Sequence, residues 1–446
     1  MLFKNRDIIV NNGQTDELKN IRRDILEILE NTINSVDPYL SVSSFLDENA
    51  NYFENKKINP SDFENLYLIG FGKASIGMAQ AICDRFKIKK GAVITNDPNN
   101  KVKCVSVETY VGGHPIPNQS SIDATNKILE ILNNCDKNDL VFTLISGGGS
   151  ALLCKPRVPL SDLQYTTDVF LKSGANIKEI NTIRKHLSYI KGGQLIKSIK
   201  GKTVCFIISD IIGDPLEFIA SGPTYPDSTT FKEAYDILEK YNIWKELPSS
   251  TINIIESGVK GDIPETPKPG EKYFESVKNI IVANNKKACK SAEITSKNLG
   301  YYPSIISTSL SGEAKDTGRF ILKKIVKNKD EKQKNIFISG GETTVTIQGK
   351  GKGGRNQEMI LSCVDDLSKK KIVFASFATD GIDGKSDAAG AIADGYTLKK
   401  AQDNNLDPNI YLKNNNSYEF FKKINDLLIT GPTGTNVMDI QLIILY

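Results

Sequence analysis

Short apolar runs recur along the chain, each followed by glycine or small polar residues and then by a helical pattern. In the first half the runs are LYLIGF, GAVITND, LVFTLI and TVCFII, and in the second half NIIVANN, SIISTSL, NIFISGG and KIVFASFA, with LLITGPTGTNVMDIQLIIL closing the chain. Continuously apolar runs of this length are typical of strands that are covered on both faces. The pattern therefore predicts an α/β protein with largely parallel sheets and helices on both faces.

The same pattern divides the chain. Its 446 residues are too many for one ordinary core and suggest about two to three domains. Residues 261–275, GDIPETPKPGEKYFE, contain three prolines and predict a linker or surface loop. We therefore predict two α/β domains of Rossmann-like or flavodoxin-like type, spanning residues 1–260 and 261–446. Near the N-terminus, apolar residues at three- and four-residue spacing predict an amphipathic packing helix: Leu18, Ile21, Ile25, Leu29 and Ile33.

Charge and cysteine content exclude several classes. A net charge of +4 from 57 basic and 53 acidic residues argues against nucleic acid or a membrane surface as a partner. Seven widely spaced cysteines without a CxxC pair predict a reducing compartment, and two histidines exclude a histidine-rich metal centre. The N-terminus lacks the apolar core of a signal peptide. We expect a soluble, cytoplasmic protein that is a monomer or a homodimer.

The stretch ISGGGSALL carries the strongest phosphate signature. Ser146, Gly147, Gly148, Gly149 and Ser150 follow an apolar strand, and glycines let backbone N–H groups approach a phosphate. The alternative is a tight strand–helix turn. A serine hydrolase is disfavoured because the spacing is not G-x-S-x-G. Asn284, at the end of the NIIVANN strand, is assigned to the same nucleotide- and phosphate-binding group.

Two cationic stretches lie before expected helices. In GFGKASIG, Lys73 follows a strand, and the motif is neither a Walker A loop nor a G-x-G-x-x-G dinucleotide fingerprint. Lys73 is either an ordinary surface lysine or part of an anion site. In GKGKGGRNQEMILS, glycines precede Arg355 and the helix after it. We interpret Lys350 and Lys352 as solvated or steering charges, and Arg355 as the residue that the glycines bring to an anion.

The segment INTIRKHLSYIKGG places four polar residues on one face of a predicted helix: Asn181, Arg184, Ser188 and Lys191. Glycines 192 and 193 are expected to end that helix. A stripe of this kind is usually solvated. Because the helix ends abruptly, we hypothesise instead that Arg184 and Lys191 bind substrate.

Carboxylates follow strands at Asp210, Glu342 and Asp380. Magnesium with a nucleotide needs only one or two protein carboxylates, so Asp210 and Glu342 are candidate metal ligands. Asp380 lies at a strand end where a general base would be placed. Glycine loops, cations and carboxylates together suit phosphoryl transfer, which depends on positioning, positive charge and a metal.

Eight segments, taken in order, resemble type II glycerate kinases: GFGKASIGMA, GGHPIPNQSS, LISGGGSALL, INTIRKHLSYIKGGQL, ISDIIGDPLEFIASGPTYPD, SGGETTVTIQGKGKGGRNQE, ATDGIDGKSDAAGAIAD and LLITGPTGTNVMDI. The resemblance runs from about residue 64 to the C-terminus and includes the MOFRL domain, here about residues 330–446. It implies two α/β domains around a cleft, ATP and Mg²⁺ as cofactors, and phosphorylation of D-glycerate, most often to 2-phosphoglycerate. Three active-site positions of the family match Lys73, Arg355 and Asp380.

The roles of these residues remain partly open. Lys73 and Arg355 would neutralise the transferred phosphoryl group or hold the glycerate carboxylate, to which a planar guanidinium is suited. Asp380 would orient or deprotonate the attacking hydroxyl. Three alternatives stay: a hydroxypyruvate reductase, for which the chain lacks a dinucleotide fingerprint; a kinase of another small hydroxy acid; and a non-catalytic binding protein for phosphorylated metabolites.

Overall fold

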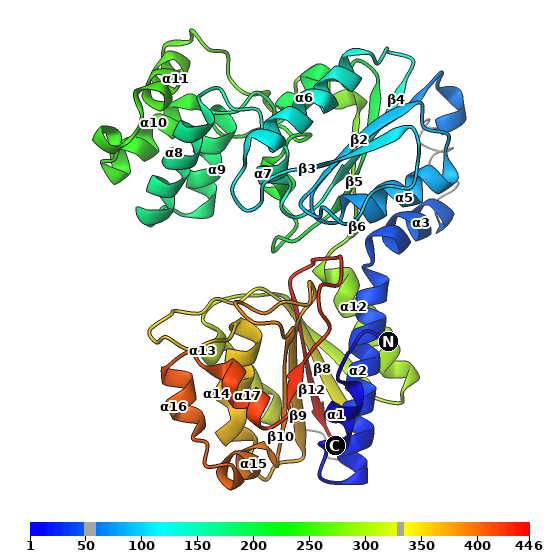
Figure 1. Ribbon diagram of the computed structural model, residues 1–446, viewed down its shortest axis with the longest axis vertical. Helices are drawn as coiled ribbons and strands as arrows, with labels where there is room; N and C mark the ends of the chain where they lie inside the picture. The colour runs from blue at the N-terminus through cyan, green and yellow to red at the C-terminus, as the bar shows by residue number, and fades with distance from the viewer. Residues whose placement is uncertain (49–58, 328–333) are drawn as a thin grey trace. The chain divides into compact units, whose positions relative to one another are not determined.

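The computed structural model describes residues 1–48, 59–327 and 334–446. Its contacts divide the chain into two units (Figure 1). The first unit is continuous, from Pro38 to Val282, and the second joins residues 1–37 to residues 283–446. None of the helices in these ranges combines the length and the apolar character that crossing a bilayer requires.

The 38–282 unit is built on a six-stranded parallel sheet in the order β3-β2-β1-β4-β5-β6. Register is continuous along the central pairs, with Phe71 of β1 opposite Ile145 of β4 and Ile145 opposite Ile207 of β5. The strands are β1 (Leu66–Phe71), β2 (Lys90–Thr95), β3 (Val107–Val111), β4 (Leu140–Ile145), β5 (Lys202–Ile208) and β6 (Val277–Ala283). The central strands are buried on both faces, as their unbroken apolar sequences predict.

Helices of the 38–282 unit lie against the sheet and in a group beside it (Figure 1). Those near the sheet are α3 (Pro38–Glu48), α5 (Ser75–Arg85), α6 (Gln119–Asn133) and α7 (Gly149–Leu152). The group beside it is α8 (Leu160–Lys172), α9 (Ile177–His186), α10 (Phe231–Tyr241) and α11 (Ser249–Lys260). This group has an apolar core of its own, which includes Phe170, Ile183, Phe231 and Leu238.

The second unit carries a mixed sheet in the order β11-β10-β9-β12-β8-β7. Its strands are β7 (Tyr302–Leu310), β8 (Asn335–Gly341), β9 (Ile372–Ala378), β10 (Gly390–Asp394), β11 (Leu427–Leu428) and β12 (Asp439–Leu445). The α/β class is as predicted, but only the β7–β8 pair is parallel here. The C-terminal strand β12 lies between the parallel strands β8 and β9 and runs against both, so "largely parallel" describes the first sheet alone.

Helices of the second unit come from both ends of the chain. They are α1 (Arg6–Asn11), α2 (Asp16–Ser35), α12 (Asn285–Asn298), α13 (Ala314–Lys327), α14 (Arg355–Leu367), α15 (Thr397–Asp403), α16 (Pro408–Lys413) and α17 (Ser417–Lys423). The predicted N-terminal helix is confirmed as α2, and its apolar stripe from Leu18 to Ile33 is buried.

A buried ion cluster fixes α2 to the second unit. The Arg22 guanidinium lies 2.6 Å from Asp394 and 2.6 Å from Asp426, and all three side chains are fully buried. Residues 1–37 therefore belong with the C-terminal segment. The predicted boundary at residues 260/261 falls inside the first unit, because β6 adds to the sheet beside β5 before the chain crosses at residues 282/283.

Candidate active site

The loops after β1 and β4 are joined at the carboxyl edge of the parallel sheet. Ser146 accepts a hydrogen bond at Oγ from the amide of Ala74, at 3.0 Å, and donates its own amide to the carbonyl of Phe71, at 3.2 Å. The amide of Lys73 donates to the carbonyl of Gly147, at 2.9 Å. Parallel strands end at the same edge, so Lys73 and the Ser146–Ser150 loop, predicted from separate motifs, are brought together.

The glycines of this loop allow close approach by other side chains. A Cβ on Gly147 would lie 2.2 Å from Oδ2 of Asp210, and one on Gly148 would lie 2.9 Å from Cδ2 of His114. Gly148 also has φ of +81°, in the left-handed region that favours glycine. Among the described residues, the amides of Gly147 and Gly148 have no hydrogen-bond acceptor. They are therefore available to an anion.

Asp210 is the acidic group of this edge. Burial raises the pKa of its carboxyl, and the charge of Lys73 partly opposes the rise. The second predicted metal ligand, Glu342, belongs to the other unit, where it pairs with Arg355 at 2.8 Å. Within residues 1–48, 59–327 and 334–446, no three acidic, histidine or cysteine side chains form a metal-binding group.

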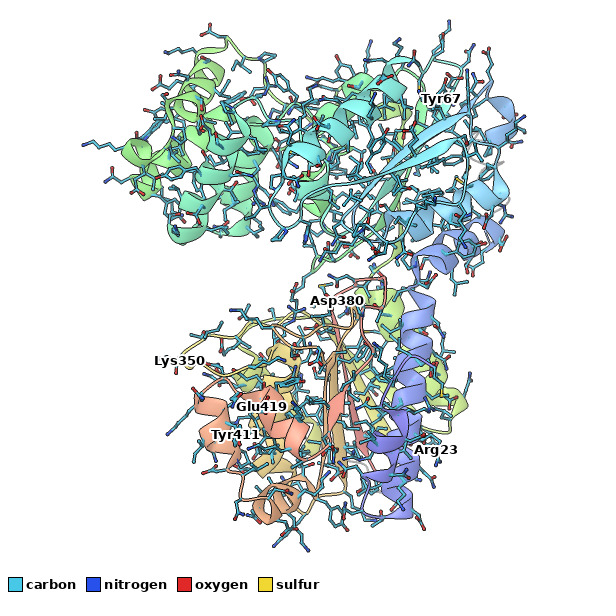
Figure 2. All side chains as sticks on the ribbon, viewed as in Figure 1. Arg23, Tyr67, Lys350, Asp380, Tyr411 and Glu419 are labelled. Atoms are coloured by element: carbon cyan, nitrogen blue, oxygen red, sulfur yellow. The ribbon has the colours of Figure 1, made fainter. Side chains whose placement is uncertain are left out.

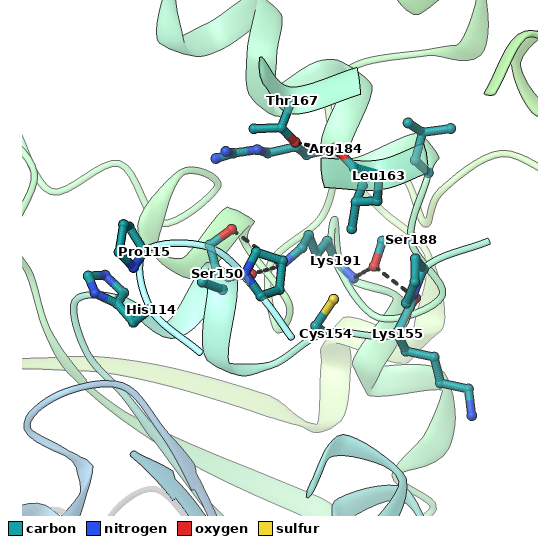
Figure 3. Close-up of a pocket in the computed structure, with 15 residues that line it drawn as sticks. His114, Pro115, Ser150, Cys154, Lys155, Leu163, Thr167, Arg184, Ser188 and Lys191 are labelled. Carbon is teal, nitrogen blue, oxygen red and sulfur yellow. Dashed lines mark hydrogen bonds between the residues drawn. The ribbon is translucent and has the colours of Figure 1, made fainter. Parts of the chain in front are cut away.

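A cavity of about 250 Å³ opens beside the glycine loop (Figure 3). Its cationic side chains include Arg184 and Lys191. Ser150 and Ser188 add hydroxyls, and apolar side chains such as Leu163 complete the wall. Three of the four predicted polar residues, Arg184, Ser188 and Lys191, line this cavity, whereas Asn181 does not and accepts a hydrogen bond from Ser221. The three do not lie along one helix, because α9 ends at His186 and Ser188 forms an isolated bridge to Pro156.

Lys191 is buried and carries its charge without a carboxylate. Its Nζ donates to the carbonyl of Ser150 at 2.5 Å, to Oγ of Ser150 at 3.3 Å and to the carbonyl of Leu153 at 3.2 Å. Burial, with a smaller contribution from Arg184, lowers the pKa of Lys191 to about 8, while Cys154 acts in the opposite sense. Burial also lowers the pKa of Arg184. In the described part of the chain, no acidic side chain pairs with either cation.

In the second unit, Arg355 begins α14 and faces two carboxylates. Its Nε lies 2.6 Å from Oδ2 of Asp439 and its Nη2 lies 3.0 Å from Oδ1, a bidentate contact. Nη1 pairs with Glu342. Burial lowers the pKa of Arg355, but Asp439 and Glu342 outweigh it, so the pKa is raised overall. Burial raises the pKa of Asp439, and Arg355 opposes that rise.

Asp380 follows β9 at the edge to which β8 and β9 run (Figure 2). Its Oδ1 accepts the amide of Ile382 at 3.0 Å, and its carbonyl accepts the amide of Thr433 at 3.1 Å. The neighbouring Asp383 is fully enclosed and accepts the amides of Asn356 (3.1 Å) and Gln357 (2.9 Å). Asp383 thus caps α14, whose own N-cap, Gly354, has no side chain.

The glycine-rich loop before Arg355 is not an open anion cradle. Its amides donate to the segment 414–416: Gly349 to Oδ1 of Asn415 at 2.9 Å, and Lys350 to Oδ1 of Asn414 at 3.1 Å. Cβ atoms on Gly349 or Gly351 would lie within 2.5 Å of this segment. Lys350 is exposed at the outer side of the loop (Figure 2), and Lys352 lies over the ring of Tyr418 at 3.9 Å. These glycines serve close packing.

Asn284 has a local role at the start of α12, where its side chain accepts the amide of Lys287 at 2.9 Å. Sequence reasoning missed its neighbour Asn285, which is buried and donates to the carbonyls of Val437 and Asp439 at 2.9 and 3.0 Å. It also missed Asp439. The sequence marks this residue only by its position directly before the apolar run IQLIIL. His114 was missed as well, although it lies in the GGHPIPNQSS segment.

The fold and these loops define an α/β protein with cations and unpaired amides at the edge of a parallel sheet. Two family models match the chain: a domain of unknown function, DUF4147, over residues 24–256, and the MOFRL family over residues 335–439. A glycerate 2-kinase of Pyrococcus horikoshii is 44% identical, over 95% of this chain and 97% of its own. The chain therefore belongs to the glycerate kinase family.

Other relatives agree in length and fold. The crystal structure of glycerate kinase from Thermotoga maritima superposes with a TM-score of 0.85 at 38% identity, covering 96% of this chain and 100% of that one. A relative from Agrobacterium vitis, 35% identical over 95% of this chain and 94% of its own, bears a provisional name as a hydroxypyruvate reductase. Similarity thus extends over nearly the whole chain.

Proposed function

We propose that this protein is an ATP-dependent kinase that phosphorylates D-glycerate, most simply to 2-phosphoglycerate, with Mg²⁺. Its family membership supports a kinase, and one observation supports an acidic substrate: the half-buried Arg184 and the buried Lys191 line one cavity without an acidic partner among the described residues. Burying an unpaired charge costs several kcal/mol, by order of magnitude. An anionic ligand would offset that cost, and the planar guanidinium suits a carboxylate.

The adjoining loop would bind phosphate. The unpaired amides of Gly147 and Gly148, with Ser146, Gly149 and Ser150 holding the loop's shape, would donate hydrogen bonds to the phosphates of ATP. Lys73 is exposed next to them and would neutralise the transferred phosphoryl group. Asp210 fits a magnesium ion that is otherwise held by phosphate and water, because such ions need only one or two protein carboxylates.

The second unit carries candidate residues of its own. Arg355 uses three of its five N–H groups on Asp439 and Glu342, which leaves two for a phosphoryl or carboxylate oxygen of a ligand. The bidentate contact fixes the direction of the guanidinium. Asp380 would orient the attacking hydroxyl. We keep Glu342 as a second candidate magnesium ligand and Asn284 as a candidate nucleotide contact.

The direct test is an assay of the purified protein with ATP, Mg²⁺ and D-glycerate. Coupling to enolase and pyruvate kinase reports 2-phosphoglycerate, and adding phosphoglycerate mutase reports the 3-isomer as well. We expect turnover without the mutase. NADH consumption with hydroxypyruvate would favour the reductase, and a panel of small hydroxy acids tests other acceptors. No phosphorylation of any acid in the panel would refute the kinase.

Arg355→Ala tests the assignment in the second unit. We expect kcat/KM with D-glycerate to fall at least 100-fold, by analogy with other preorganised charged donors, which contribute about 3–4 kcal/mol. Arg23→Ala is the control, since Arg23 is exposed on α2 and donates a hydrogen bond to Oδ1 of Asn20. An unchanged kcat/KM in Arg355→Ala, with a normal melting temperature, would remove Arg355 from the site.

A further inference from the structure

His114 stands at the carboxyl edge of the first sheet, in the loop between β3 and α6. The loop is held at both ends: the amide of Gly112 donates to the carbonyl of Thr95 at 2.8 Å, and that of Gly113 donates to Oδ1 of Asn118 at 3.0 Å and Oγ of Ser121 at 2.9 Å. The position of the imidazole therefore follows from the fold. Figure 3 shows His114 beside Ser150, bordering the cavity that contains Lys191 and Arg184.

The imidazole of His114 approaches the glycine loop with its Nε2 edge. A Cβ on Gly148 would lie 2.9 Å from Cδ2 and 3.1 Å from Nε2. Within the described residues, neither ring nitrogen of His114 has a hydrogen-bond partner. The other histidine of the chain differs: His186 is buried, with Nδ1 at 2.7 Å from the carbonyl of Thr182 and Nε2 at 3.3 Å from Glu265. His186 is structural, whereas His114 has free nitrogens at a cavity.

The charges around His114 keep it neutral. Burial, and then the charge of Lys73, lower its pKa. The other ionisable groups at the cavity are Lys155, Arg184, Lys191 and Cys154, and its lining contains no carboxylate. Asp210 faces Gly147 and Lys73 on the other side of the glycine loop. A neutral imidazole is a proton acceptor, and the cationic side chains that line the cavity are of the sign that favours this form.

We propose that His114 is the general base that accepts the proton of the substrate hydroxyl during phosphoryl transfer. This assignment rests on the proposed function. The hydroxy acid lies in the cavity with its carboxylate toward Arg184 and Lys191 and its hydroxyl at His114. As the bond between the γ-phosphorus of ATP and the ADP oxygen breaks, a bond from the substrate oxygen to that phosphorus forms. The hydroxyl proton moves to the imidazole, which then releases it to water.

The test compares His114→Gln and His114→Ala with the wild-type protein in the glycerate assay. General bases contribute about 10²–10⁴-fold. We expect kcat to fall about 100-fold in both variants, with KM for D-glycerate changed less than threefold. In the wild type, kcat should rise with pH as His114 loses its proton, and this rise should be missing in His114→Gln. Ile116→Gln, at an exposed residue of the same loop, is the control and should retain wild-type kcat.

Chemical rescue separates a proton acceptor from a packing role. Added imidazole should restore part of the kcat of His114→Ala in proportion to its concentration, and should leave the wild type unchanged. A kcat within threefold of wild type, a pH dependence unaltered in His114→Gln, or no rescue of a folded His114→Ala would each overturn the assignment alone. A wild-type protein without kinase activity would overturn the proposed function, and the assignment with it.

Discussion

The buried ammonium of Lys191 can be tested by replacing it with a side chain of similar length and no charge. Lys191→Met removes the donor to Ser150 and Leu153 and the positive charge at the cavity. Because the ammonium is held by carbonyls, a substrate carboxylate would lie beyond it, at about 6 Å. At that distance and an effective dielectric constant of about 20, two unit charges attract by about 3 kcal/mol. We therefore expect KM for D-glycerate to rise about 100-fold, with KM for ATP changed less than threefold.

The buried charge of Lys191 should also make the free energy of unfolding depend on pH. A pKa lowered from 10.5 to about 8 means that the folded state carries the charge at a cost of about 3 kcal/mol at neutral pH. Between pH 8 and 10.5 the unfolded chain binds the proton that the folded protein has lost, so the free energy of unfolding of the wild type should rise with pH. Lys191→Met should lack this rise. At pH 7, Lys191→Met removes both the cost of the buried charge and the hydrogen bonds of the ammonium, and these two effects on the free energy of unfolding roughly cancel.

The measurements are steady-state kinetics and urea unfolding at several pH values. Lys197→Met is the control, because Lys197 is exposed and lies outside the cavity, yet loses the same charge from the same segment. If Lys191→Met bound D-glycerate with a KM within threefold of wild type, the cavity would not be the site of the acid. If the free energy of unfolding of Lys191→Met still rose between pH 8 and 10.5 as in the wild type, the rise would come from a group other than Lys191.

Two further predictions concern the second unit. Arg22→Met should lower the free energy of unfolding by about 3–5 kcal/mol, because Asp394 would remain buried without its cation and Asp426 would keep only Lys400; urea unfolding checks this, and a loss below 1 kcal/mol would contradict it. Asp383→Ala should destabilise by about 2–4 kcal/mol through the unpaired donors of α14. Burial raises the pKa of Asp383 to about 6, so its contribution to stability should decline from pH 4 to 6 and this decline should vanish in Asp383→Ala.

The fold class was predictable because the strand sequences are unusually clear. Runs such as TVCFII are apolar throughout, and β5 is buried as such runs predict. Two strands were not anticipated: β3, an edge strand with exposed residues, and β10, whose sequence GAIAD consists mainly of small residues. The antiparallel insertion of β12 could not be inferred either, because strand order depends on contacts between distant segments.

In the candidate site, too, local sequence patterns were predictable and contacts between distant segments were not. Glycine loops after strands identified the edge near Lys73 and Gly147, since all strands of a parallel sheet end together. Arg184 and Lys191 do border one cavity, although the helical spacing from which they were paired ends at His186. The partners of Arg355 were beyond prediction, because Asp439 lies 84 residues further on. Local pattern identifies cations, but only the fold shows which are already neutralised.

The position of α2 has a consequence for how the protein forms. Residues 1–37 are synthesised before the 38–282 unit, yet the aspartates that neutralise Arg22 are made 372 and 404 residues later. The whole 38–282 unit is synthesised between them and is in effect inserted into its neighbour. An N-terminal fragment ending near residue 282 would carry α2 with its apolar stripe and its arginine unpartnered. Such a helix exposes apolar side chains that a chaperone could bind until the C-terminal segment, including β12, has been synthesised.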